Sequence, residues 1–245
     1  VLAVPAARGR ILDRAGQVLA DNDEAIRVVV TASLAGNLSA VLRTLSRLVS
    51  IGEDEQAQLI ARAHRQPPNV PLIVLPEIGF EEAARINLLA ARLPGIETET
   101  WSRRRYRGGG PVNHLVGYVG APERIAMDDD PVLRHPDARV GRTGVERGRE
   151  ADLRGVSGRV RREVDARGRI VRSVEMQRPV RGRDIALTID LGVQRLVTKR
   201  MERERRAALV GIDCSTGGIV AMVSVPGFEI SDIGRPVRSS AWSRI

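Results

Sequence analysis

Lysine, cysteine and aromatic residues are scarce in this chain of 245 residues. Cys214 is its only cysteine, which excludes an intrachain disulfide and a cysteine-rich metal site. Because Cys214 lies in an apolar, strand-like context, we predict that it is a small core residue. Aromatic residues make up 2% of the chain, so the core must be built from Val, Leu, Ile and Ala.

Long apolar segments are missing as well. No run approaches the roughly 18 residues of a membrane-spanning helix, and no segment has the basic start and apolar centre of a signal peptide. We therefore expect the chain as given to be soluble. An apolar content of 42% and a charged content of 28% fit a globular protein with one large or two modest domains.

Arginine supplies almost all of the positive charge, since Lys199 is the only lysine among 39 basic residues. A net charge of +9 first suggests an anionic partner. The arginines, however, are interleaved with 30 acidic residues, and no zinc-finger, helix-turn-helix or aromatic stacking pattern occurs. Coding composition explains the bias more simply, and a basic module that binds nucleic acid or another anionic surface remains the alternative hypothesis.

The common catalytic and cofactor motifs are also absent. No G-x-G-x-x-G follows a predicted strand, and no G-x-S-x-G, H-E-x-x-H or C-x-x-C occurs. The histidines at 64, 114 and 135 are far apart, and the acidic run at 128–130 lacks the pattern of a calcium loop. We therefore predict no metal site, no cofactor and no catalytic residue. His114 stands beside apolar residues, and we expect it to be a hydrogen-bonded core residue.

Residues 36–100 have the periodicity of helices. Apolar residues between 38 and 49 recur on one helical face, and three acids at 53–55 begin a second helix that runs to about residue 65. A third helix begins after Gly79 and ends at Pro94-Gly95, with a short strand at 70–78 before it. The pattern predicts a helical subdomain inserted between β segments.

The rest of the chain is typical of short strands. Strands are expected at 25–32, 96–106, 159–164, 169–175 and 184–189, a Gly-rich turn at 107–111, a loop at 121–140, a helix at 191–206 and a strand pair at 209–224. The expected class is therefore α+β.

A turn pattern recurs along these strands. Asp13-Arg14-Ala15-Gly16 is echoed at 165–168, and a version one residue longer begins at Asp213. Asp suits the first position of such a turn because its carboxylate accepts backbone N–H groups, and Gly suits a position with positive φ. The repetition predicts hairpin turns and disfavours a catalytic or phosphate-binding role for the first of them.

The ordered motifs around these turns resemble those of class B penicillin-binding proteins. The residues that carry the resemblance follow in chain order: Arg8-Gly9-Arg10-Ile11-Leu12-Asp13-Arg14-x-Gly16; Arg104-x-Tyr106; His114-Leu115-Val116-Gly117-Tyr118; Gly141-Arg142-Thr143-Gly144-Val145-Glu146 with Glu150 and Gly155; Glu163-Val164-Asp165; Gly182-x-Asp184; and Asp213-x-x-Thr216-Gly217-Gly218. The segments LVGYVG and EVDARGR resemble the elongation-specific branch of the family.

The resemblance implies a fold and a place for the chain. Residues 1–185 would form an elongated, β-rich pedestal with a helical head at about 36–100, and residues 186–245 the incomplete start of a transpeptidase domain, a helix plus a β-hairpin. Intact members of the family crosslink peptidoglycan and bind penicillin in the periplasm, tethered to the inner membrane by an anchor that this chain lacks. The partners implied are a RodA-type glycosyltransferase and an MreC-type scaffold.

The family's catalytic motifs are missing from the chain. Ser-x-x-Lys and Lys-Thr-Gly both need a lysine, and Leu196 stands three residues before Lys199. We expect the catalytic serine to lie beyond Ile245, and this chain to be inactive by itself.

Two interpretations of the motif residues remain open. In the structural one, Arg8, Arg10, Asp13 and Arg14 form ion pairs and a turn cap that fix the hairpin against Arg104, Glu146 or Glu150. In the functional one, they form a contact surface for the glycosyltransferase. The glycines of the motifs are expected to supply backbone conformations and not to bind a ligand. The candidate structural or interaction residues are Arg8, Gly9, Arg10, Asp13, Arg14, Gly16, Arg104, Tyr106, His114, Gly117, Gly141, Gly144, Glu146, Glu150 and Gly155.

Overall fold

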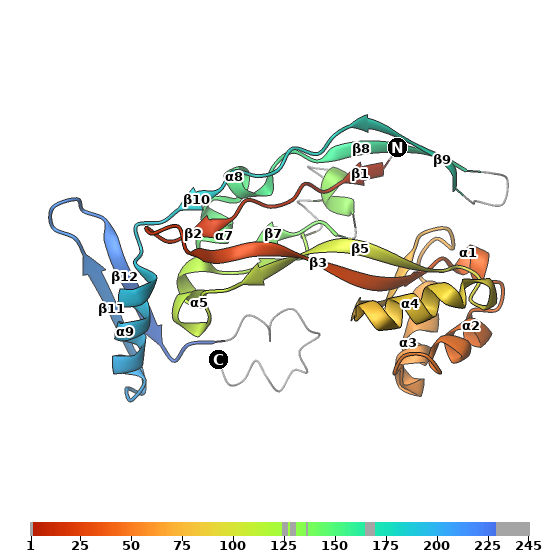
Figure 1. The fold of residues 1–245 in the computed structure, drawn as a ribbon, viewed down its shortest axis with the longest axis horizontal. Helices are drawn as coiled ribbons and strands as arrows, with labels where there is room; N and C mark the ends of the chain where they lie inside the picture. Colours follow the sequence, from red (N-terminus) through yellow and green to blue (C-terminus); the bar gives the residue numbers. More distant parts are fainter. Residues whose placement is uncertain (1, 124–126, 128–130, 136, 165–169, 229–245) are drawn as a thin grey trace. The chain divides into compact units, whose positions relative to one another are not determined.

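The computed structural model describes residues 2–123, 127, 131–135, 137–164 and 170–228, and mixes helices with strands (Figure 1). The predicted α+β class is confirmed. Contacts divide the chain into two compact units. Unit 1 comprises residues 1–23, 104–160 and 175–245, and unit 2 comprises residues 24–103 and 161–174. No helix in the described ranges is both long and apolar enough to cross a membrane.

The helical insert forms most of unit 2. Its strands are β4 (Leu72–Ile78) and parts of β3 (Val18–Val30) and β5 (Ile96–Tyr106), with β3 in the middle. Its helices are α1 (Ala32–Ala35), α2 (Leu38–Leu45), α3 (Glu53–Ala63) and α4 (Phe80–Leu88), followed by the 3-10 turn η1 (Ala90–Arg92).

Local side chains explain where these helices begin. The Asn37 side chain accepts a hydrogen bond from the Ala40 N–H at 3.0 Å and caps α2. The acids at 53–55 occupy the first turn of α3, where the helix dipole favours negative charge. Glu82 accepts from the Gly79 N–H at 2.9 Å at the start of α4. The apolar faces of the helices and strands then share one core, which includes Val28, Val30, Leu42, Leu45, Leu59, Leu72, Val74, Ile86 and Leu93.

Unit 1 is built from short pairings between distant segments. Strand β2 (Ile11–Leu12) lies antiparallel to β3 and parallel to β10 (Ile185–Ala186). The other pairings within unit 1 are β1 (Leu2–Val4) with the start of β8 (Gly158–Val164), and β6 (Val119–Gly120) with β7 (Val140–Gly141). Strand β8 also pairs with β9 (Ile170–Gln177), and most residues of these two strands belong to unit 2. Its helical segments before residue 160 are α5 (Gly110–Val116), η2 (Pro131–Arg134), α7 (Gly144–Gly148) and α8 (Glu150–Arg154).

Unit 1 also includes a helix and a hairpin near its end. Helix α9 (Leu191–Met201) precedes β11 (Ala207–Ile212) and β12 (Ile219–Val225), which pair antiparallel. Both α9 and α5 pack against β12. The Asp190 carboxylate caps α9 by accepting from the N–H groups of Gly192 and Val193. The core of unit 1 joins Ile11, Leu19, Ala20, Val112, Val116, Leu153 and Leu191.

Two of the three predicted Asp turns are confirmed. Gly16 has φ +81° and Gly217 has φ +71°, the left-handed region that glycine adopts without strain. Asp13 accepts from the N–H groups of Ala15 and Gln17, each at 2.8 Å. The echo at 165–168 lies outside the described residues, as does the acidic run at 128–130.

Two predictions of burial are wrong. Cys214 is exposed, because it lies in the turn between β11 and β12 and not in a strand. His114 is hydrogen-bonded but exposed, because α5 buries Val112, Asn113 and Val116 and leaves His114 on its outer side.

Some predicted boundaries move. The helix predicted over 38–49 is α2 and ends at Leu45. The helix predicted over 191–206 is α9 and ends at Met201, and turns follow both helices. The predicted Gly-rich turn at 107–111 already contains the start of α5, with Pro111 in its first turn, where a missing N–H costs nothing. The predicted strand at 184–189 is reduced to β10.

Candidate functional site

Four charged motif residues meet in unit 1, although they lie up to 142 positions apart. Glu146 is completely buried and accepts from two arginines: Arg8 Nε at 2.5 Å and Arg104 Nε at 2.7 Å. The Arg8 guanidinium also contacts Glu150 Oε2 at 2.5 Å. We call Arg8, Arg104, Glu146 and Glu150 the buried ion cluster.

The buried ion cluster also ties backbone segments together. Arg104 donates to the Gly9 carbonyl at 2.8 Å, and Arg8 donates to the Glu146 carbonyl at 2.9 Å. Glu150 Oε2 accepts from the Gly141 N–H at 2.8 Å. The cluster thus holds the segment before β2, the end of β5, strand β7 and helices α7 and α8 in one arrangement.

The electrostatics of the cluster favour fixed charges and not proton transfer. Burial by itself opposes the charge of Arg8, but the hydrogen bond to Glu150 and the negative charges of Glu146 and Glu150 outweigh it and raise the pKa of Arg8. Burial, with the negative charge of Glu146, raises the pKa of Tyr106 far above its usual value, so its hydroxyl stays neutral. That hydroxyl accepts from the Val119 N–H at 2.9 Å. The geometry is that of a structural clamp.

The remaining charged candidates lie outside the cluster. Asp13 is 2% exposed and accepts a third hydrogen bond, from Leu191 N–H at the start of α9, at 3.3 Å. Arg10 lies at the surface and forms an ion pair with Asp184 at 2.8 Å. The Arg14 side chain is exposed and forms no ion pair within the described part of the chain.

The motif glycines allow backbone segments to approach closely. A Cβ atom at Gly9, Gly117, Gly141, Gly144 or Gly155 would lie no farther than 2.4 Å from a backbone oxygen of another segment. A Cβ atom at Gly117, which follows α5, would meet the carbonyl of Thr143, and one at Gly144, at the start of α7, would meet the carbonyl of Leu115. Larger residues at these positions would force the segments apart.

A second set of contacts joins α5 to α9 and β12. Gln194 is completely buried, and its amide donates to the Pro111 and Met222 carbonyls and accepts from the Met222 N–H. Asn113 donates to the Phe228 carbonyl at 2.6 Å, and the His114 Nε2 lies 3.1 Å from the Pro226 carbonyl oxygen. Sequence reasoning did not single out Asn113, since a lone Asn on a short helix carries no distinctive pattern.

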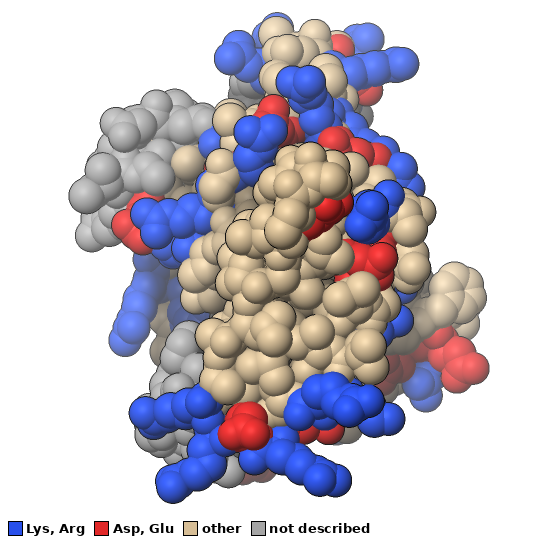
Figure 2. Space-filling model, turned by 90° about the vertical axis from the view of Figure 1, so that its left-hand side faces the viewer, with Lys and Arg blue, Asp and Glu red and all other residues tan. Residues whose placement is uncertain are grey.

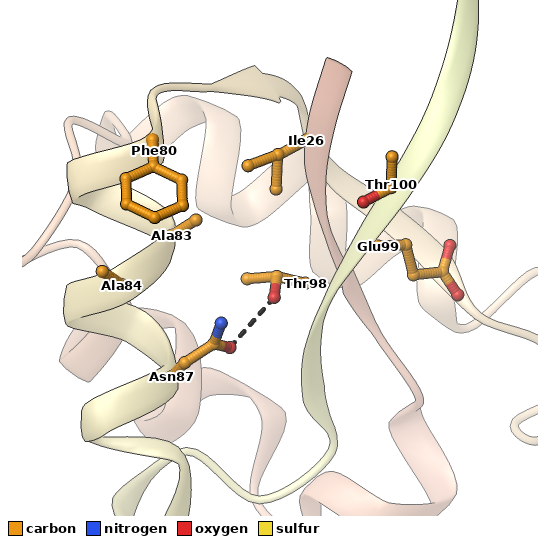
Figure 3. A pocket seen from close by; sticks show the side chains of 8 residues that line it. All are labelled: Ile26, Phe80, Ala83, Ala84, Asn87, Thr98, Glu99 and Thr100. Carbon is orange, nitrogen blue, oxygen red and sulfur yellow. Dashed lines mark hydrogen bonds between the residues drawn. The ribbon is translucent and has the colours of Figure 1, made fainter. Parts of the chain in front are cut away.

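Unit 2 has a surface groove that sequence reasoning also missed. It has a volume of about 280 Å³ and lies between α4 and the strands β3 and β5 (Figure 3). Its lining combines apolar residues of α4 and β3 with polar ones, namely Ile26, Phe80, Ala83, Ala84, Asn87, Thr98, Glu99 and Thr100. The Phe80 side chain is 80% exposed at its border. We call this feature the α4 groove.

The polar side of the α4 groove is ordered by its own contacts. Thr98 donates to the Asn87 side-chain oxygen at 2.9 Å, as Figure 3 shows. Arg27 forms an ion pair with Glu99 at 2.7 Å and lies over the Trp101 ring, 5.8 Å from its centroid. One wall of the groove can therefore contact an apolar side chain of a partner, and the other wall can contact a polar group. No cluster of His, Cys, Asp and Glu that fits a metal ion occurs among the described residues.

A comparison with protein families identifies the family of the chain. The model of the penicillin-binding protein dimerisation domain matches residues 3–187, which include every residue of the buried ion cluster. The chain belongs to this family. The sequence-based resemblance to class B penicillin-binding proteins is thereby confirmed.

Curated relatives of this dimerisation-domain protein are longer than the chain. The peptidoglycan D,D-transpeptidase MrdA of Haemophilus influenzae is 27% identical over 262 residues, an alignment that covers 98% of this chain and 40% of the relative. MrdA of Escherichia coli is 31% identical over 234 residues, with 94% of this chain and 37% of the relative covered. The chain therefore spans well under half the length of these relatives.

A solved structure shares the fold. The complex between the penicillin-binding protein PBP2 and MreC from Helicobacter pylori matches with a TM-score of 0.80 and 21% identity. The match covers 99% of this chain and 46% of that chain.

Proposed function

We propose that this chain is the non-catalytic pedestal of a peptidoglycan D,D-transpeptidase of the MrdA type, together with the start of its transpeptidase domain. The family match over residues 3–187 carries the proposal. In this function the buried ion cluster holds the segments around β2, β5 and β7 together, and the Gln194 contacts hold α9 and β12 against the start of α5. The boundary between pedestal and transpeptidase start at residues 185–186 is part of the proposal.

The proposed division of labour assigns no chemistry to the chain. Neither Ser-x-x-Lys nor Lys-Thr-Gly occurs in it, so no nucleophilic serine has the basic partner that acylation needs. A fluorescent penicillin should leave the chain unlabelled under conditions that label an intact MrdA relative. Covalent labelling of the chain would contradict this part of the proposal.

We further propose that unit 2 contacts an MreC-type scaffold through the α4 groove. The PBP2 that shares the fold was solved as a complex with MreC. The groove is bordered by one of the most exposed large apolar side chains of the described residues, Phe80, and an apolar partner side chain would cover it. A RodA-type glycosyltransferase partner and a periplasmic location beside the inner membrane complete the proposal.

Two substitutions on the same helix test the groove. Phe80→Asp places a charge at the border of the groove. It should raise the dissociation constant of the chain and an MreC-type scaffold at least tenfold, and a tenfold change corresponds to about 1.4 kcal/mol of binding free energy. Leu88→Asp is the matched control, because Leu88 is 84% exposed on α4 and does not line the groove. Equal binding by both variants and the original chain, measured by calorimetry, would place the contact elsewhere.

The alternative of a basic nucleic-acid-binding module gains no support. The family and the relatives are those of cell-wall enzymes. Many arginines are also already committed to carboxylates, as Arg8, Arg27, Arg104 and Arg107 illustrate.

A further inference from the structure

Helix α4 carries the two most exposed large apolar side chains of the described residues. Phe80 is 80% exposed and Leu88 is 84% exposed. They lie eight residues apart in one helix, so both project from the same side of α4, and the exposed Ala84 lies midway between them. We call Phe80, Ala84 and Leu88 the α4 stripe; Figure 3 shows its first two residues.

The opposite side of α4 is packed into unit 2. Ala83 and Ile86 are 4% and 2% exposed, and Ile86 belongs to the core of that unit. The helix thus buries one apolar side and exposes another. Residues 79–93, which contain α4 and the turns at its two ends, are described without a gap and lie inside the family-matched residues 3–187.

The hairpin of β11 and β12 also exposes apolar side chains. Figure 2 shows the side of the chain where this hairpin lies, with a broad uncharged surface and Lys and Arg along its border. In the proposed function the hairpin begins a domain that continues in the longer relatives, so its exposed side chains do not identify a partner. The α4 stripe belongs instead to the helical insert of the pedestal.

Two charged residues accompany the α4 stripe. Glu81 and Arg85 are exposed and lie one turn apart, on the flank of the helix next to Leu88. Neither forms an ion pair within the described part of the chain. The stripe is therefore bordered by one acid and one base whose charges are available to a partner.

We propose that two copies of this chain associate by antiparallel packing of their α4 stripes. With Ala84 at the centre, Phe80 of each copy packs against Leu88 of the other, and the small Ala84 side chain lets the two helices approach closely. The same arrangement brings Glu81 of each copy beside Arg85 of the other, so opposite charges meet twice. A surface that complements itself in this way is what a two-fold symmetric dimer requires.

The contact in this dimer is small. We expect one helix from each copy to bury less than the roughly 1,200–2,000 Å² of a stable protein complex. The dissociation constant of the dimer should therefore lie between about 1 μM and 1 mM. Because each copy uses its only α4 in the contact, association stops at two copies.

Sedimentation equilibrium of the chain, at concentrations up to about 1 mM, tests the proposal. We expect a reversible monomer–dimer equilibrium that Leu88→Asp abolishes, because two carboxylates then enter the apolar contact. Glu81→Arg and Arg85→Glu should each raise the dissociation constant of the dimer about tenfold, since each sets like charges together twice. The double variant with both reversals exchanges the two charges and should restore the original dissociation constant.

Matched variants separate the α4 contact from general stickiness or unfolding. Met176→Asp adds a carboxylate at a residue of β9 that is 58% exposed, and Arg62→Glu reverses an exposed charge on α3; both should dimerise like the original chain. Unchanged melting temperatures at a concentration that keeps the chain monomeric establish that the α4 variants are folded. Three results would overturn the proposal: a chain that stays monomeric, a Leu88→Asp variant that dimerises normally, or a double variant that dimerises no better than the single reversals.

The proposal does not rest on the proposed function, although Phe80 takes part in both contacts. Leu88→Asp separates them, because Leu88 does not line the α4 groove. This variant should lose the dimer and keep its binding to an MreC-type scaffold, whereas Phe80→Asp should lose both. Normal dimerisation without scaffold binding would contradict the proposed function alone.

Discussion

At the scale of single residues, Glu146 lies at the centre of the buried ion cluster of unit 1. Its carboxylate lies completely buried between two arginines, and each arginine also holds a backbone carbonyl. A buried charge pair contributes little net stability against apolar residues of the same size, but removing one partner leaves the other charge buried and unpaired. The cluster is therefore expected to be intolerant of single substitutions.

Glu146→Ala should lower the free energy of unfolding by about 3–5 kcal/mol, because Arg104 and one side of Arg8 lose their counter-charge. Urea unfolding measures the loss. Glu175→Ala is the control: it breaks an ion pair with Arg178, which is 89% exposed, and surface pairs contribute about 1 kcal/mol or less. Equal losses of unfolding free energy for the two variants would contradict the central role of Glu146 in the buried ion cluster.

Asp13→Ala should lower the free energy of unfolding by about 2–4 kcal/mol. The reason is that three backbone N–H groups, those of Ala15, Gln17 and Leu191, lose a charged acceptor. Thermal unfolding and urea unfolding, followed in separate experiments, measure this loss of stability. Arg14→Ala, next to it in the turn but exposed, should change stability by about 0.5 kcal/mol or less. Unchanged melting of the Asp13 variant would refute its capping role.

At the scale of elements, local signals predicted much of the fold. The spacing of apolar residues at 38–49, the acids in the first turn of α3 and two of the Asp–Gly turns each act within a few residues, and the elements they predict are present. Burial in short helices was harder. α5 has seven residues, too few for a periodicity that separates the exposed His114 from its buried neighbour Asn113.

The exact partner of each charged residue in the candidate site is beyond single-sequence reasoning. Arg8 and Glu146 lie 138 positions apart, and nothing in either local segment identifies the partner. The structural interpretation of the motifs expected ion pairs between the hairpin and Arg104, Glu146 or Glu150, but it did not say which residues pair. The α4 groove had no signal at all, because Phe80 follows the helical pattern and only the packed structure reveals that it is left outside the core.

The link between β2 and β10 should depend on pH. Asp184 accepts from the Arg10 N–H at 2.7 Å and from its side chain at 2.9 Å. Partial burial opposes the charge of Asp184, but the hydrogen bonds from Arg10 and the charge of Arg181 outweigh it and lower its pKa below 3.8. A lowered pKa in the folded state stabilises the fold above the unfolded-state value, and this contribution disappears as the pH falls through the folded-state value.

The Asp184→Asn variant isolates this effect. Its stability deficit relative to the original chain should be constant near neutral pH and should shrink as the pH falls from about 4 towards 2. Urea unfolding across this pH range measures it. A deficit that does not change with pH would show that the carboxylate charge plays no part in the link.

At the scale of the whole molecule, each unit has a core of its own. Leu45 lies completely buried in the core of unit 2, and Leu153 completely buried in that of unit 1. Separate cores favour separate opening of the two units, since hydrogen-exchange protection follows cooperative units of packing.

Leu45→Ala should therefore act on unit 2 alone. Loss of the side chain should destabilise that unit by about 2–5 kcal/mol and speed hydrogen exchange at amides of α2, α3 and β4, while α9 and β12 keep their original protection. Leu153→Ala should produce the reverse pattern, with faster exchange in β2, α5 and α9. If either substitution speeds exchange equally in both units, the chain unfolds as one cooperative body and the two cores are not independent.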